Sequence, residues 1–219
     1  MGSKDSAFDE FIRLCRSWSE QMAALKEEAL RIDYMRGQLP ELLLNRPVVG
    51  AILNHIAKGD PVLNMGRCGI FENEILIYLD PQRLFSVRVY FHLPGEFTPI
   101  HDHSAWGFNG TPQGALDIVR YRREDDGADP RRASLKKTEQ VVLTPGEVGI
   151  VHRLDAGIHR TGNTTDRINA MISVYGSPIR RLYIRTFDPG SGRIEKRFPP
   201  KIQKRQLAKI AMRQYNEKI

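Results

Sequence analysis

The feature that most constrains the fold is a series of short, strand-like runs that fills the chain from Gly69 onward. Six of these runs are rich in β-branched and aromatic residues: ILIYL, FSVRVYFHL, ALDIVRY, EQVVLT, VGIVHRL and NAMISVYG. Turn-forming sequences such as PGE, NGTPQG and DPGSG separate them. Regularly spaced strands with turns between them, and no helical period, predict a sandwich or barrel over residues 69–199. The polar stretch Asp125–Arg132 is expected to be a surface hairpin loop.

Residues 1–68 have a different pattern, because their apolar side chains recur at helical spacing. Pro40 and Pro47 predict breaks in this helical region, and the sequence GDP at 59–61 predicts its end. A chain of 219 residues is long enough for one sizeable core. We therefore expect one structural domain, with the helices packed on the barrel. The residues that carry the helical spacing are Phe8, Phe11, Ile12, Cys15, Met22, Leu25, Ala29 and Ile32.

The net charge of +7 is concentrated in the tail, residues 200–219, where six lysines and arginines face one acid, Glu217. A run of this kind is typical of a solvated helix face, so we expect a short basic C-terminal helix and no nucleic-acid partner. Such a segment can also hold phosphate backbones, and nucleic-acid binding stays open as an alternative.

Other features of the sequence indicate where in the cell the protein is located. No apolar run approaches the roughly 18–20 residues that would span a bilayer. The N-terminus lacks the layout of a signal peptide, and Cys15 and Cys68 are not part of a CxxC motif. We expect a cytoplasmic protein with two reduced thiols and no membrane partner.

Two histidines one residue apart, His101 and His103, form the most informative local pattern. Alternation along a strand puts both imidazoles on one face, with Asp102 pointing the other way. Such a pair can take adjacent positions on a metal, but the site needs a further ligand from another strand. The best third ligand is His159, in the turn-flanked sequence DAGIHRTGN. The remaining histidines, which are predicted to have structural or outer-layer roles, are His55, His92 and His152.

The spacing around these histidines resembles the motifs of the cupin superfamily. The first cupin motif has a glycine, five residues, H-x-H, a glutamate a few residues on, and a second glycine six residues later. Gly107 stands where this glutamate is expected. The residues that match the first motif are Gly95, His101, His103 and Gly114, and those that match the end of the second are His159 and Asn163.

Replacement of the glutamate by a small residue is a mark of cysteine dioxygenase-like thiol dioxygenases. The sequences LPGEFTPIHDHSAWG and PGEVGIVHRLDAGIHRTGN look like the bacterial branch, which includes 3-mercaptopropionate dioxygenases. The resemblance covers about Glu72 to Asp188 and the helical region before it. It implies a mainly β fold: a single cupin barrel (double-stranded β-helix, or jelly roll) with N-terminal helices and a short C-terminal helix. It also implies one Fe(2+) per chain on three neutral histidines, with a small thiol and O2 as substrates and a sulfinic acid as product.

The resemblance also marks catalytic positions on the last long strand-like run. The family carries a Ser-x-His-x-Tyr relay there, and this chain keeps the tyrosine as Tyr175. Ser173 replaces the relay histidine and Met171 replaces the relay serine, so Tyr175 and Ser173 are the candidate catalytic residues. No Cys–Tyr cross-link is expected, since Gly107 or Phe108 occupies the position of the cysteine.

The sequence offers several candidates for the residues that bind the substrate. The family's carboxylate-binding arginine falls on Ile184, with Arg185 beside it, and a shift of one residue reverses the face of a strand. Arg88 and Arg160 are alternatives. An inward Glu74 favours a substrate that bears an amine, and Trp106 is placed to wall the oxygen pocket. The candidate substrate-binding residues are therefore Glu74, Arg185 and Trp106.

The sequence leaves other functions open, and it does not fix the identity of the metal. A cupin can bind a metal without oxygen chemistry, as an isomerase or lyase or as a sensor. An oxygenase of this type can also act on a small non-thiol substrate. Histidine sites accept zinc, nickel, copper or iron, so the ligand type alone does not choose the metal.

Overall fold

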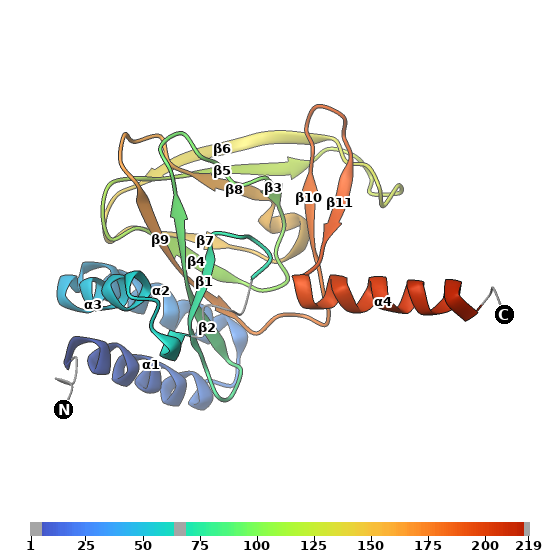
Figure 1. The fold of residues 1–219 in the computed structure, drawn as a ribbon. Coiled ribbons are helices and arrows are strands. Elements are labelled where there is room, and N and C mark those ends of the chain that lie inside the picture. Colours follow the sequence, from blue (N-terminus) through green and yellow to red (C-terminus); the bar gives the residue numbers. More distant parts are fainter. Residues whose placement is uncertain (1–5, 64–68, 217–219) are drawn as a thin grey trace.

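The computed structural model describes residues 6–63 and 69–216, and Figure 1 shows their arrangement. The predicted fold class is confirmed: the chain is mainly β, with helices before and after the strands. The α-helices are α1 (Ser6–Ala24), α2 (Glu28–Leu44), α3 (Arg46–Ala57) and α4 (Pro200–Asn216), and the 3-10 helices are η1 (Pro61–Leu63) and η2 (Leu154–Gly157). The strands are β1 (Glu74–Leu79), β2 (Phe85–His92), β3 (Ile100–His101), β4 (Gly107–Gly110), β5 (Leu116–Arg123), β6 (Leu135–Leu143), β7 (Val148–Val151), β8 (His159–Gly162), β9 (Asn169–Gly176), β10 (Ile184–Phe187) and β11 (Ile194–Arg197).

The strands form two antiparallel sheets that face each other as a barrel. The first has the order β1-β2-β9-β4-β7 and the second β11-β10-β3-β8-β5-β6. Apolar side chains from both sheets meet in one cluster, which includes Tyr90 and Met171 from the first sheet and Leu116 and Ile118 from the second. The predicted loop at Asp125–Arg132 connects β5 and β6, which pair as a hairpin.

The three N-terminal helices cover the outer face of the first sheet (Figure 1). Trp18 on α1 is fully buried, and its ring centroid lies 5.9 Å from the ring centroid of Phe85 on β2. Because helices cover one face and the second sheet the other, every residue of β9 is buried. Burial of each large apolar side chain contributes about 1.5–3 kcal/mol. The α1 side chains buried at helical spacing are Phe8, Phe11, Cys15, Trp18 and Met22.

The predicted helix break at Pro40 is wrong, because α2 continues through this residue. A proline inside a helix removes one backbone hydrogen bond, but Leu39 and Leu42 beside it are fully buried. The break falls instead between Ala24 and Glu28. Pro47 lies in the first turn of α3, where proline is tolerated.

Two features outside the barrel complete the fold. The helix α4 begins beside the barrel and extends away from it, with residues 203–214 exposed. Among the described helices, none is long and apolar enough to span a membrane. Cys15 is a buried free thiol whose pKa is raised by burial, and Cys68 lies outside the described residues.

Candidate metal centre and its cavity

Backbone pairing brings the three predicted ligands together inside the barrel. His101 on β3 and His159 on β8 are direct cross-strand partners, and His103 lies two residues beyond His101. One potential ligand atom from each histidine lies within 4.8 Å of the others. Within residues 6–63 and 69–216, this is the one group of at least three histidine, cysteine or acidic side chains with such geometry.

Two of the rings are held in place through backbone carbonyls. Nδ1 of His101 donates to the Pro99 carbonyl at 2.8 Å, and Nδ1 of His159 donates to the Gly157 carbonyl at 3.0 Å. This assignment of the proton leaves Nε2 of both rings free for a metal. Nε2 of His103 is buried and has no hydrogen-bond partner in the described part of the chain. An unpaired buried nitrogen of this kind is satisfied when it ligates a metal.

The histidines are also in the right protonation state. Burial lowers the pKa of His101 to about 4. Burial lowers the pKa of His103 and His159 well below the usual value, and neighbouring positive charges add to the effect. All three rings are therefore neutral near pH 7, which is the form that binds metals. The residues present fit a metal ion.

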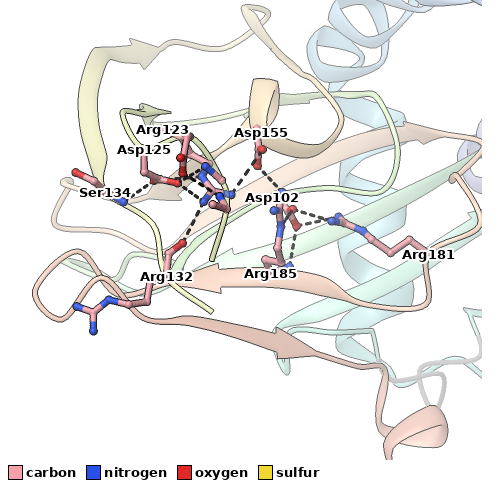
Figure 2. Close-up of polar contacts among 11 residues, drawn as sticks. Asp102, Arg123, Asp125, Arg132, Ser134, Asp155, Arg181 and Arg185 are labelled. Atoms are coloured by element: carbon pink, nitrogen blue, oxygen red, sulfur yellow. Dashed lines mark hydrogen bonds and ion pairs between the residues drawn. The ribbon is translucent and has the colours of Figure 1, made fainter. Parts of the chain in front are cut away.

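Asp102, between His101 and His103 in the sequence, is fully buried, and its carboxylate faces two arginines (Figure 2). Arg181 donates to both carboxylate oxygens, at 2.7 and 2.8 Å. Arg185 donates through its backbone N–H at 2.7 Å and through Nε at 2.6 Å. The carboxylate thus accepts four hydrogen bonds. We did not predict this network from the sequence, although an aspartate between two ligands and nearby arginines were signals for it.

The same network reaches the third ligand. Arg185 also binds Asp155, in the short helix η2 that ends at Gly157. Figure 2 shows the contacts continuing from Asp155 to Arg123 and Asp125. The segment that carries His101 is therefore connected by ion pairs to the segment that orients His159.

Arg185 was predicted to bind substrate, and its position argues against that role. Its guanidinium lies against Asp102 and Asp155, whereas its neighbour Ile184 lines the cavity beside the site. Successive residues of a strand point to opposite faces, so only one of the two can reach the cavity. Of the two alternative arginines, Arg88 lines the cavity, and Arg160 stacks on Phe97 at 4.7 Å from the ring centroid.

A cavity of about 540 Å³ opens beside His103. Its inner end is polar, and it passes into an apolar section toward α4. Such a volume lies in the range of about 300–1,000 Å³ that is usual for ligand sites. The polar residues of the inner end are Glu74, Ser86, Arg88, Tyr90, His103 and Tyr175.

Glu74 faces the cavity, but its charge is already paired. The carboxylate accepts a hydrogen bond from Arg88 and a second one from the backbone N–H of Ile70, at 3.1 Å. Gly69 packs so closely that a Cβ there would lie 1.9 Å from the carboxyl carbon of Glu74. The expectation that Glu74 selects an amine is weakened, because Arg88 supplies the positive charge that an amine would bring.

Tyr175 projects from β9 into the inner end of the cavity. Its ring stacks on His103 with 5.4 Å between centroids, and its hydroxyl donates to Oδ1 of Asn109 at 3.3 Å. Burial raises the pKa of Tyr175, so the hydroxyl keeps its proton near neutral pH. Ser173, two residues earlier on the same face, is fully buried and pairs across the sheet with Arg88 and Asn109. The sequence analysis did not identify Asn109.

Trp106 is not among the residues that line the cavity. It packs in the core between the first sheet and the helices, and its indole lies against Gly176. A Cβ at position 176 would lie 2.1 Å from Cε2 of the indole. The predicted role of Trp106 as a wall of the oxygen pocket therefore has no geometric support.

The other motif residues build the fold. Gly95 and Gly114 have φ angles of +77° and +68°, a region that favours glycine. The side-chain nitrogen of Asn163 donates to the carbonyls of His92 and Arg167, at 3.0 and 2.6 Å, which ties the end of β8 to β2.

The fold and the site together define a double-sheet barrel protein with an internal three-histidine cluster. The chain matches no protein-family model. Among solved structures it is similar to an oxalate oxidase in complex with glycolate, at 22% identity and a TM-score of 0.35, over 46% of this chain and 44% of that one. The match thus spans less than half of the oxidase chain.

Two further solved structures are described as cupins. One is a Cupin_2 domain of an XRE family transcriptional regulator from Enterobacter cloacae, with 16% identity and a TM-score of 0.34 over 48% of this chain and 96% of that one. The other is a sugar phosphate isomerase from Silicibacter pomeroyi, with 16% identity and a TM-score of 0.36 over 59% and 78%. All of these TM-scores are below 0.5, and the activities in these names belong to those proteins.

Proposed function

We propose that this protein is a non-haem iron(II) dioxygenase that oxidises a small thiol to a sulfinic acid. The observation that carries the proposal is a cluster of three neutral histidines with no carboxylate in the group, of which His103 lines the inner end of a cavity. Two acids of this region are engaged elsewhere, Asp102 by two arginines and Glu74 by Arg88. The resemblance of the histidine motifs to thiol dioxygenases supports the same function.

Neutral ligands suit this chemistry because they leave the full charge of a divalent metal to attract an anionic thiolate. Bound iron would supply redox exchange with oxygen and acidify the thiol. In the overall reaction, RSH and O2 give RSO2H. Both oxygen atoms join the sulfur, which loses four electrons to oxygen, so no external reductant is required.

The side chains of the inner cavity have separate roles in this proposal. The ring of Tyr175 stacks on His103, and its hydroxyl keeps its proton, which would turn from Asn109 to a bound substrate or oxygen as a hydrogen-bond donor. Ser173 adds a second, fully buried hydroxyl on the same face of β9, although it is not among the residues that line the cavity. Arg88, paired with Glu74 and 5.6 Å from the ring centroid of Tyr175, orients that ring.

The test is oxygen uptake by protein loaded anaerobically with iron(II). We expect small thiols to stimulate uptake, with one O2 consumed per thiol and a product that carries two additional oxygen atoms. His101→Ala should lose both iron and uptake, whereas His152→Ala, at an exposed histidine outside the cluster, should keep both. Uptake that no thiol stimulates, or protein that binds no iron, contradicts the proposal.

A further inference from the structure

The cavity beside His103 continues beyond its polar inner end. Its outer section is built by three separate segments: the end of β1, the connection before β10, and the residues at the start of α4. Figure 1 shows the first turn of α4 at the barrel, with the rest of the helix extending away. The apolar residues that line this section are Leu79, Pro178, Leu182, Tyr183, Pro199 and Ile202.

The cavity lining also includes Arg83 and Arg181, and the guanidinium of Arg181 is paired with Asp102. The outer section is therefore open and mainly, not wholly, apolar. Ile202 is half-buried, although the α4 residues after it are exposed, and Leu182 is 64% exposed. A substrate of only a few polar atoms would fill the inner end and leave this section to water. Water against apolar walls is displaced favourably by an apolar group.

We propose that the substrate is amphipathic, with its reacting head at the histidines and an apolar tail in the outer section against Leu182 and Ile202. The identity of the head as a thiol rests on the function proposed above. The tail follows from the cavity alone. The start of α4 accordingly serves as a wall of the binding site, and Ile202 and Leu182 determine the preference for chain length.

The test measures the affinity of iron(II)-loaded, full-length protein for ethanethiol, butanethiol and hexanethiol without oxygen, by calorimetry. Burial of each methylene should tighten binding by about fourfold. Ile202→Asn and Leu182→Asn should flatten this gain. Leu207→Ser, on the exposed part of α4 away from the cavity, should leave the whole series unchanged. Leu182 is exposed, so its variant is expected to fold.

Equal affinity along the series, or a gain that both cavity variants leave intact, would overturn the inference. The matching alcohols, ethanol to hexanol, separate it from the proposed function. If affinity rises with length for the alcohols while no thiol stimulates oxygen uptake, the thiol function fails and the apolar tail site stands. If short thiols stimulate uptake but affinity stays flat, the tail site fails and the thiol function stands.

Discussion

Gly107 on β4 and Tyr175 on β9 face each other as cross-strand partners, and a Cβ at position 107 would lie 2.5 Å from Cδ1 of the tyrosine ring. It would also lie 2.6 Å from the carbonyl oxygen of Val174. The space that a side chain at position 107 would occupy is therefore filled by the ring of Tyr175 and the backbone of Val174. A glutamate side chain at position 107 would therefore have no room in this packing.

The first prediction concerns this contact. Gly107→Ala should lower the free energy of unfolding by about 1–3 kcal/mol, because the backbone of Val174 cannot move away easily. Urea denaturation measures the effect. Gly37→Ala is the matched control, since Gly37 lies in α2 and a Cβ added there would meet nothing within 4 Å, and it should stabilise by about 0.5–1 kcal/mol. A Gly107→Ala protein as stable as the parent would contradict the packing described here.

The second prediction concerns Asp102 as a positioning residue. Asp102→Asn removes a buried charge from two arginines, and it should weaken metal affinity by about 10–100-fold because the segments that carry the ligands lose their connection. Competition with a coloured chelator measures this affinity. The mutation should also cost about 3–5 kcal/mol of stability.

The control for this variant is Asp33→Asn, which breaks an exposed pair with Arg36. Exposed pairs contribute roughly 0–1 kcal/mol, so both stability and metal affinity should stay near those of the parent. Unchanged metal affinity in Asp102→Asn would show that the network is structural only.

The third prediction concerns pH in the metal-free protein. The folded-state pKa of His101 is about 4, below the value of about 6.5 expected for an unfolded chain. Above that higher value both states are neutral and the histidine has no effect. As pH falls below it, the unfolded state takes up the proton first, so stability decreases by up to about 1.4 kcal/mol per pH unit for each such histidine.

The midpoints of urea-induced unfolding test this dependence in chelator-treated protein. They are measured from about pH 7.5 to about pH 4.5, a range that spans most of the titration of histidine. His101→Gln removes one titrating group and should make the decline shallower. An equally steep decline in the variant would assign the acid sensitivity to carboxylates instead.

The fourth prediction concerns Tyr175. Tyr175→Phe keeps the ring on His103 but removes the hydroxyl, so it should lower kcat for thiol oxidation by about 10²–10⁴-fold with iron content unchanged. Tyr78→Phe is the control, because Tyr78 stacks on Phe85 in the core on the helix side. Steady-state oxygen uptake at saturating thiol gives both values, and full activity in Tyr175→Phe would exclude it as a proton donor.

Local patterns were enough to predict much of this protein. The strand-like runs, the turns between them and the helical spacing around Phe11 and Cys15 depend on neighbours in the sequence, and they indicated the fold class. The alternation of His101 and His103 placed two ligands on one face, and motif spacing added His159. The break at Pro40 failed because buried leucines from the same helix outweigh one lost hydrogen bond.

Only the tertiary structure decided what surrounds the histidines. The pairing of Arg88 with Glu74, the engagement of Arg185 by Asp102, and the place of Trp106 in the core all join residues on different strands. One-residue differences in register decide which side chain enters the cavity, and the pattern of a single strand does not contain the register with its neighbours. The sequence by itself therefore determined the fold class and the three histidines, while packing between distant segments decided the shape, charge and polarity of the cavity.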